Sequence, residues 1–512
     1  MISVRNAFLR IALGSWLLIV VGCSLSCGGQ GQPPAPSQNK ARQDSKPVRN
    51  TAAVTLPALL VSDIHFDPFH DPAAVQQLVD ASVSEWNGIL AAPSSSNALK
   101  AFADLQKTCK MHGADTSYAV LVSSLQAMRK RQPKPRFITV SGDLIAHAFF
   151  CRYKAVFPES TQSDYQAFVL KTMSFVMGEL RAGFPGVPIY LALGNNDTPC
   201  DDYRLDAGSD FLRQAGKIVS QGLPSAQQLH ALKDFSQGGY YSVPMPAPMR
   251  DTRLIVIDDL FMSSQYSTCA GKPDTAGADA EIAWLRETLA EARRLRERVW
   301  VMGHIPPGVD PYSTAARLKD ICGKEAPVMF LSSDKLADLL IEYADVIRLG
   351  LFAHSHMDEI RLLKAEGSDS KPASNPAGEN GVAIKMVPSI SPIDGNNPSF
   401  TVARIDPDSA KLKDYEVIAA SNQTGIATIW SREYDFGRTY HQAEFSSAAL
   451  RETIAGFAND RDAKDEVSKA YIRNFYAGDR SDELTPFWPE YICALANYTA
   501  KAFAVCACAA GK

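Results

Sequence analysis

The stretch RFITVSGD, residues 136–143, decides the fold class of this chain. Its first six residues form a short run rich in apolar and β-branched side chains, which is typical of a buried strand. The strand ends in Gly142-Asp143, so a carboxylate follows its carboxyl end directly. Four more apolar runs are each followed by a polar motif: PALLVS by Asp63-Ile64-His65, PIYLAL by Gly194-Asn195-Asn196-Asp197, RVWVM by Gly303-His304, and VIRLGLFA by His354-Ser355-His356. Because sites in α/β proteins form where loops leave the carboxyl ends of strands, the five motifs predict one site.

Strands and helices alternate from Ala58 to about Ile405. The clearest helical stretches, with apolar residues at three- and four-residue spacing, are residues 117–131, 165–180 and 278–296. This alternation predicts an α/β domain with sheet at its centre and helices outside. We assign residues 51–405 to this main domain.

The chain changes character after residue 405. Residues 446–457 and 463–476 have helical spacing, and residues 489–510 form an apolar stretch with three cysteines that we expect to be one helix. We therefore assign residues 406–512 to a helical, cysteine-containing C-terminal subdomain. Within the main domain, residues 200–239 and 366–381 are predicted to be loops because glycine and polar residues are scattered through them.

The N-terminus has the pattern of an export signal. Arg5 and Arg10 precede the apolar run 11–21, which is too short to span a bilayer but suits a signal-peptide core. The run ends in VVGC, which resembles a bacterial lipobox and implies lipidation of Cys23 and export to the cell envelope. We assign residues 1–22 to a signal peptide and residues 23–50 to a lipidated cysteine with a disordered tether. A plain signal peptide or an uncleaved anchor is the alternative.

The number of cysteines is consistent with export. The chain has ten, and eight remain when Cys23 and Cys27 of the leader and tether are set aside. An even number in an exported chain predicts disulfides, although the sequence does not fix their pairing. The alternative is a cysteine metal site, but no C-x-x-C pair occurs.

The net charge is close to balanced. Lysine and arginine total 52, and aspartate and glutamate total 56, which gives −4. A chain without an excess of positive charge is not expected to bind a nucleic-acid polymer. A small-molecule or lipid substrate fits better.

The five motifs supply a ligand set for two divalent metals. Two carboxylates, one amide and four imidazoles are the expected ligands: Asp63, His65, Asp143, Asn195, His304, His354 and His356. Imidazole with carboxylate suits Zn, Mn or Fe better than Ca. Any one of these histidines could instead be a structural residue, but four of the nine histidines in the chain follow strands in this order.

These motifs resemble the pattern D-x-H, G-D, G-N-H-[DE], G-H and G-H-x-H of the calcineurin-like metallophosphoesterase superfamily. Within it, the chain is most similar to the acid sphingomyelinase-like phosphodiesterases, over roughly residues 56–405. The resemblance implies an α/β, four-layer αββα sandwich and two metals, usually zinc. It also implies that one metal takes Asp63, His65, Asp143 and His356, and that the other takes Asp143, Asn195, His304 and His354.

The chain departs from that pattern at two positions. Ala353 stands where the last motif usually begins with glycine, which removes no ligand. Asn196 stands where the family carries a histidine that acts on the leaving group, and an amide cannot donate a proton as an acid does. We expect His147, four residues after Asp143, to take this role, as a histidine at that spacing does in sphingomyelinase-like enzymes. The alternative for His147 is a structural histidine in the loop.

The resemblance implies a phosphoester hydrolase in which a metal-bridging hydroxide attacks phosphorus and His147 protonates the leaving group. Phosphodiesters, either sphingomyelin-like lipids or nucleotides, are the expected substrates. An endopolyphosphatase or phosphomonoesterase of the same fold is one alternative, since the form G-N-N-D also occurs in endopolyphosphatases. A non-catalytic surface protein that keeps its metals for binding or structure is another.

Overall fold

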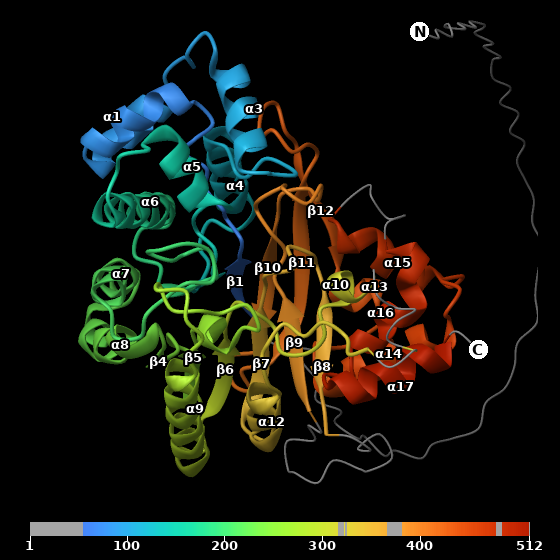
Figure 1. Ribbon diagram of the computed structural model, residues 1–512. Helices are drawn as coiled ribbons and strands as arrows, with labels where there is room; N and C mark the ends of the chain where they lie inside the picture. Colours follow the sequence, from blue (N-terminus) through green and yellow to red (C-terminus); the bar gives the residue numbers. More distant parts are fainter. Residues whose placement is uncertain (1–54, 316–321, 323–324, 366–380, 478–483, 511–512) are drawn as a thin grey trace, which may run out of the picture. The chain divides into compact units, whose positions relative to one another are not determined.

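Two six-stranded sheets form the centre of the molecule (Figure 1). The computed structural model describes residues 55–315, 322, 325–365, 381–477 and 484–510. The first sheet has the order β12-β11-β10-β1-β2-β3 and the second the order β4-β5-β6-β7-β9-β8. The strands are β1 Leu56–Val61, β2 Ile138–Ser141, β3 Ile189–Ala192, β4 Tyr241–Pro244, β5 Thr252–Val256, β6 Arg298–Met302, β7 Ile347–Phe352, β8 Ile360–Leu363, β9 Val382–Met386, β10 Ser399–Ile405, β11 Leu412–Ala420 and β12 Trp430–Asp435.

Alternate residues of the second sheet face two different cores. In β6, Trp300 and Met302 belong to the core that the two sheets share, whereas Val299 and Val301 face a core formed with outer helices. The ring of Trp300 packs edge-on against Phe137 beside β2, with ring centroids 5.8 Å apart. Because side chains alternate across a strand, this division shows that the second sheet is buried on both faces.

Helices cover the outer face of each sheet. On the first sheet lie α4 (Tyr118–Arg131) and α6 (Gln162–Gly183), whose buried apolar residues belong to the same hydrophobic cluster as those of β1, β2 and β3. On the second lie α9 (Ala276–Leu295) and α12 (Lys335–Glu342). The expected αββα sandwich is therefore confirmed, and the predicted helices 117–131, 165–180 and 278–296 correspond to α4, α6 and α9.

The remaining helices extend this frame. In the first part of the chain they are α1 Val75–Asp80, α2 Trp86–Leu90, α3 Ala98–Thr108, α5 Phe149–Val156, α7 Asp210–Ser220, α8 Ser225–Gly238 and α10 Pro311–Ala315. Near the C-terminus they are α13 Phe436–Thr439, α14 Ser447–Asn459, α15 Glu466–Phe475, α16 Trp488–Ala494 and α17 Ala500–Ala510. The helices near the C-terminus gather on the side of β8, and α14 packs against β8 and β9 (Figure 1). None of the described helices is long and apolar enough to cross a bilayer.

Two expectations about helices are wrong. Residues 200–239 are not only loop, because α7 and α8 lie within them. The signal was present in the apolar spacing of Phe211, Ala215 and Ile218, but the glycines around it suggested a loop. Residues 489–510 form two helices, α16 and α17, rather than one, because the chain bends between Leu495 and Thr499.

The expected boundary at residue 405 does not coincide with the end of the first sheet. Strands β11 and β12 lie beyond it and continue that sheet, because β11 pairs antiparallel with β10 and β12 pairs antiparallel with β11. Only from Phe436 onward is the described chain predominantly helical. The expected signal peptide and tether, and the loop at 366–381 up to residue 380, lie outside the described residues.

All eight cysteines of the folded part form disulfides, as expected. The pairs are Cys109–Cys151, Cys200–Cys269, Cys322–Cys508 and Cys493–Cys506. Disulfides persist in oxidising compartments, so this pairing is typical of an exported protein.

We expect the double variant Cys109→Ser/Cys151→Ser to lower the free energy of unfolding by about 2–4 kcal/mol, because this disulfide closes a 42-residue segment of the unfolded chain. Denaturant titration of the variant and the unmodified protein measures the loss. The control is Cys493→Ser/Cys506→Ser, whose bridge closes only 13 residues and should cost less. A larger loss in the control would contradict the loop-closure argument.

Candidate metal centre

All five motifs meet at the carboxyl ends of β1, β2, β3, β6 and β7, as the sequence predicts. The loops that carry them adopt unusual backbone geometry. Five of the seven expected ligands have left-handed φ angles: Asp63 (46°), His65 (43°), Asp143 (56°), His354 (73°) and His356 (64°). Non-glycine residues in this region are strained, and such strain concentrates at functional sites.

Glycines allow the loops to approach one another. A Cβ on Gly194 would lie 2.1 Å from Oδ1 of Asp143, and one on Gly142 would lie 2.6 Å from Nδ1 of His304. Neither position therefore has room for a side chain. The motifs G-D and G-N therefore require glycine, because only a residue without a side chain lets these loops pack in direct contact.

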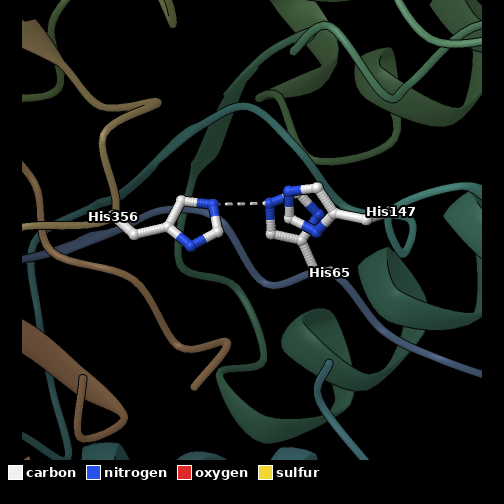
Figure 2. A group of neighbouring side chains, drawn as sticks. All are labelled: His65, His147 and His356. Atoms are coloured by element: carbon white, nitrogen blue, oxygen red, sulfur yellow. Dashed lines mark hydrogen bonds between the residues drawn. The ribbon is translucent and has the colours of Figure 1, made fainter. Parts of the chain in front are cut away.

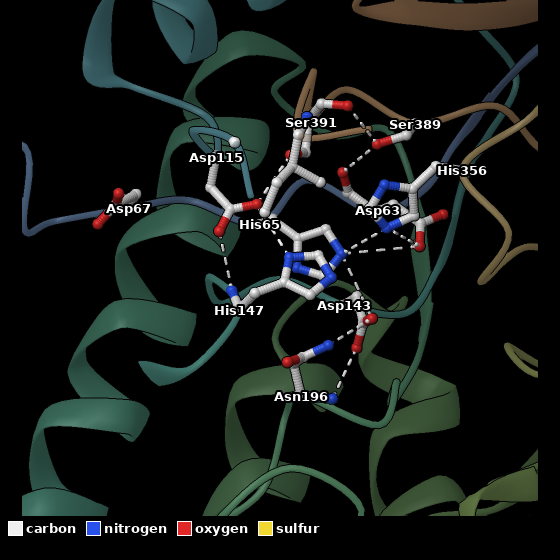
Figure 3. Close-up of polar contacts among 12 residues, drawn as sticks. Asp63, His65, Asp67, Asp115, Asp143, His147, Asn196, His356, Ser389 and Ser391 are labelled. Atoms are coloured by element: carbon white, nitrogen blue, oxygen red, sulfur yellow. Dashed lines mark hydrogen bonds and ion pairs between the residues drawn. The ribbon is translucent and has the colours of Figure 1, made fainter. Parts of the chain in front are cut away.

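The first group of expected ligands surrounds Asp63. Nε2 of His65 lies 3.1 Å from Nε2 of His356 and 3.4 Å from Oδ2 of Asp143 (Figure 3). Nε2 of His356 lies 3.5 Å from Oδ1 of Asp63. These side chains are almost fully buried, and ligand atoms of Asp63, His65 and Asp143 lie within 4.8 Å of one another.

The second group shares Asp143. Nε2 of His304 lies 3.1 Å from Oδ2 of Asp143 and 3.1 Å from Oδ1 of Asn195. A ligand atom of His354 completes this group, with Asp143, His304 and His354 all within 4.8 Å of one another. Because Asp143 belongs to both groups, its two oxygens can contact two cations.

Backbone carbonyls hold two of the imidazoles in a defined tautomer. Nδ1 of His65 donates to the carbonyl oxygen of Ile145 (2.9 Å), and Nδ1 of His304 donates to that of Ser141 (2.7 Å). In the neutral form of each ring, Nε2 then carries no proton, and this atom faces the other expected ligands. Histidines that bind metals are held in this way by a partner on the second nitrogen.

Neighbouring side chains also orient two further expected ligands, Asn195 and His354. The amide of Asn195 donates from Nδ2 to Oδ1 of Asp202 (2.7 Å), which turns its Oδ1 toward His304. Nε2 of His354 lies 3.2 Å from the hydroxyl of Tyr203. The loop after β3 therefore positions ligands through Asp202 and Tyr203 as well as supplying Asn195.

The centre has the charge balance of a cation site. Both carboxylate oxygens of Asp63 are buried and accept no hydrogen bond from the described residues. Burial would raise the pKa of Asp143, but His304 and His65 hold that pKa well below its usual range. Burial would likewise lower the pKa of His304, whereas Asp143 raises it to about 10. In the metal-free site protons thus compensate the buried carboxylates, and cations that bind there would replace those protons.

His147 lies beside this centre, as expected. Its ring stacks on His65 with centroids 3.9 Å apart, and Nδ1 donates to Oδ1 of Asp115 (3.0 Å). Asp115 is fully buried and pairs with Arg152, which also pairs with Asp67. Asp115 thus fixes the orientation of this partly exposed ring through Nδ1.

A different role for His147 is also compatible with the distances. His65, His147 and His356 each offer a nitrogen within 4.8 Å of the other two, and so could hold one metal among them (Figure 2). A metal-content measurement on a His147 variant, described below, separates a ligand from a proton donor.

Asn196 points toward the shared carboxylate. Its backbone N–H donates to Oδ1 of Asp143 (2.8 Å), and its side-chain Nδ2 donates to Oδ2 (2.9 Å). Figure 3 shows the amide directed at Asp143 from below. The residue that replaces the motif histidine therefore contacts the centre through Asp143.

Several carboxylates that support the ligands were not predicted. These are Asp115, Asp202, Asp259 and Asp394, which contact His147, Asn195, the His304 loop and His356 respectively. Asp259 accepts from the backbone N–H groups of His304 and Ile305, at 2.9 Å each. It follows β5 closely, in the same way as the predicted motifs follow their strands, and this signal could have been used. The other three lie in loops without any comparable signal.

Removing the Asp197 carboxylate should destabilise the protein by about 3 kcal/mol or more. Its Oδ1 accepts from the N–H groups of Leu144 (2.8 Å) and Ile145 (3.2 Å), and its Oδ2 from that of Gly194 (3.1 Å). Asp197→Ala leaves three buried donors unpaired, at roughly 1–3 kcal/mol each before relaxation. Denaturant titration in the presence of a chelator measures the loss. The exposed Asp462→Ala serves as the control, and equal stability of the two variants would contradict this account.

Comparison with known proteins agrees with this geometry. The family model described as calcineurin-like phosphoesterase matches residues 56–358. The chain belongs to the calcineurin-like phosphoesterase family, and it is accordingly a phosphoric ester hydrolase.

Its relatives confirm the resemblance to acid sphingomyelinase-like phosphodiesterases. The chain is 26% identical to sphingomyelinase phosphodiesterase C of Dictyostelium discoideum, over 59% of this chain and 61% of that protein. It is 22% identical to human acid sphingomyelinase-like phosphodiesterase 3b, over 78% and 81%. It is also 24% identical to human cyclic GMP-AMP phosphodiesterase SMPDL3A, over 87% and 86%.

Proposed function

We propose that this protein is a dinuclear-metal phosphodiesterase. The observation that carries the proposal is the convergence of seven expected ligands in two groups that share Asp143. One of these groups contains a buried carboxylate, Asp63, that has no hydrogen-bond partner among the described residues. Ionised carboxylates are buried at acceptable cost only when a cation or several donors compensate them.

The residues divide between two cations. Asp63, His65, Asp143 and His356 would hold one, and Asp143, Asn195, His304 and His354 the other. The mixture of imidazole, carboxylate and amide suits zinc, with manganese or iron as alternatives. When bound, such a pair supplies a hydroxide nucleophile at neutral pH and neutralises charge on the phosphoryl oxygens.

We propose that His147 donates a proton to the leaving group. Asp115 accepts a hydrogen bond from Nδ1 of His147. The proton that is transferred to the leaving group would therefore be carried by Nε2. The pair Arg152 and Asp67 holds Asp115 in place from behind. Asn196, by contrast, would keep the Asp143 carboxylate oriented between the two ligand groups.

The substrate is proposed to be a phosphodiester, either a sphingomyelin-like lipid or a nucleotide. The names of the relatives include both a sphingomyelinase phosphodiesterase and a cyclic GMP-AMP phosphodiesterase, and this supports the phosphodiester class rather than one member of it. The polyphosphatase alternative rested on Asn196, and the contact of Asn196 with Asp143 gives this residue a role that requires no polyphosphate.

A comparison of substrates tests this function. The metal-loaded protein is assayed with bis-p-nitrophenyl phosphate, p-nitrophenyl phosphate, sphingomyelin, a cyclic dinucleotide and polyphosphate. We expect the diester to be hydrolysed faster than the monoester that has the same leaving group. Preference for the monoester or for polyphosphate would assign the protein to another activity of the same fold.

We also propose that the protein is exported and anchored through a lipid on Cys23. The four disulfides support export. The lipobox-like sequence before Cys23 supports the anchor. Mass spectrometry of the mature N-terminus tests the anchor directly.

A further inference from the structure

Two loops that are far apart in sequence pack together beside the metal centre. They are residues 112–115 and 389–394, which we call the clasp. A Cβ on Gly113 would lie 2.2 Å from the carbonyl oxygen of Ile393, so the two backbones are in direct contact. The hydroxyl of Ser391 donates to Oδ1 of Asp115 across the same contact (2.9 Å).

The clasp holds the backbone of two expected ligands. The N–H of Ser391 and the hydroxyl of Ser389 both donate to the carbonyl oxygen of Asp63, at 3.0 Å each. The N–H of Ser389 donates to the carbonyl oxygen of His356 (3.1 Å). Figure 3 shows Ser389 and Ser391 on the side of Asp63 that lies away from Asn196. The clasp is therefore part of the frame of the first group of ligands.

At the outer end of the clasp, Asp394 lies between two histidines. Its Oδ2 is 2.9 Å from Nδ1 of His356, and its Oδ1 is 2.8 Å from Nε2 of His112. The His356 side chain is 3% exposed, that of Asp394 is 35% exposed and that of His112 is 65% exposed. Asp394 thus connects a buried ring of the centre with the protein surface.

We propose that Asp394 is a positioning residue of the metal centre. Its carboxylate would accept the N–H at Nδ1 of His356 and so direct Nε2 of that ring toward Asp63. His112 supports Asp394 from the solvent side. The inference rests on the proposed function, because it requires His356 to be a metal ligand. A carboxylate on the second nitrogen fixes both the tautomer and the orientation of a ligating imidazole.

Asp394 differs in this respect from an ordinary surface ion pair. An exposed pair contributes little, about 0–1 kcal/mol. Here one partner is buried, and Nδ1 of His356 makes no regular hydrogen bond with the described residues. The Asp394 carboxylate, with Oδ2 at 2.9 Å, is the charged group that faces this nitrogen. Without Asp394 the proton of the neutral ring is free to move to Nε2, the atom that must be unprotonated to bind a cation.

Metal affinity tests the inference. Zinc binding to the folded chain is measured by competition with a chromophoric chelator, and the absorption spectrum is recorded after cobalt substitution. We expect Asp394→Ala to weaken one of two bound equivalents by about 10–100-fold and to change the cobalt spectrum. Asp394→Asn should lose less, because its amide oxygen can still accept from Nδ1. His112→Ala should lose less than Asp394→Ala.

The matched control is Asp71→Asn. Asp71 also joins two loop segments, by accepting hydrogen bonds from Ser95, but it contacts none of the expected ligands. The metal affinity of the Asp71→Asn variant should equal that of the unmodified protein. The melting temperature of each metal-free variant is measured alongside. Because the inference concerns orientation rather than folding, Asp394→Ala should melt within a few degrees of the unmodified protein without metal.

Three outcomes would overturn the inference. Unchanged affinity for both equivalents in Asp394→Ala would refute the role of Asp394 and leave the proposed function intact. A lower melting temperature without metal, together with unchanged affinity, would show that Asp394 is only structural. An unmodified protein that binds no metal would refute the proposed function, and this inference with it.

Discussion

Asp143→Asn is expected to abolish turnover of bis-p-nitrophenyl phosphate, by on the order of 10³-fold or more. Loss of a single electrostatic group from an active site already costs about 10²–10³-fold, and Asp143 is the carboxylate shared by both ligand groups. An amide offers one neutral oxygen instead of two charged ones. Its NH₂ group would also face the donors of Asn196, which now point at Oδ1 and Oδ2. Steady-state kinetics and elemental analysis measure the two effects.

The matched control for Asp143→Asn is Asp258→Asn. Asp258 is equally buried, and burial together with the charge of Asp259 raises its pKa well above the usual value. The protonated form of Asp258 is therefore favoured, and asparagine preserves the shape and the neutral charge of that form. We expect this control to keep its activity and its metals. Retention of activity by Asp143→Asn would refute the bridging role.

His147→Ala should slow hydrolysis of diesters with poor leaving groups by about 10²–10⁴-fold, the usual contribution of general acid catalysis. A leaving group such as p-nitrophenol departs without protonation and should be affected much less. The experiment compares kcat for a nitrophenyl diester and an alkyl diester. Asp115→Asn should give a smaller loss of the same kind, because the amide can still accept from Nδ1 of His147.

Metal content separates the two roles that the geometry allows for His147. A proton donor can be removed without loss of metal, whereas removal of a third imidazole beside His65 and His356 would release one equivalent. We expect His147→Ala to retain both. The exposed His230→Ala controls for the loss of any histidine. Equal slowing of both diesters, or loss of a metal, would contradict the assignment of His147 as the proton donor.

The sequence predicts the centre of this molecule well because its signals are local. Each expected ligand motif directly follows an apolar run, and all five runs are strands of the two sheets, from β1 to β7. In sheets with parallel strands, order along the chain and position at the carboxyl edge are closely linked. The convergence of Asp63, Asp143 and His304 could therefore be expected before any coordinates were known.

The supporting shell could not be predicted in the same way. Asp115 and Asp394 lie in loops that contact each other although they are almost 280 residues apart in sequence, as in the hydrogen bond of Ser391 with Asp115. Nothing in the local spacing of either loop indicates this pairing. The same is true of β12, whose exposed positions obscure its place in the first sheet. Long-range packing decides these features, and local patterns do not report it.

The central claim is that Asp63, Asp143 and their partners hold two metals that are required for hydrolysis. One titration tests it most directly: metal-free protein is loaded stepwise with zinc or manganese while bis-p-nitrophenyl phosphate turnover is recorded. We predict negligible turnover without metal and a rise that saturates at two equivalents per chain. A folded protein that binds fewer than two equivalents at saturation, or that hydrolyses the diester equally well without metal, would contradict the account.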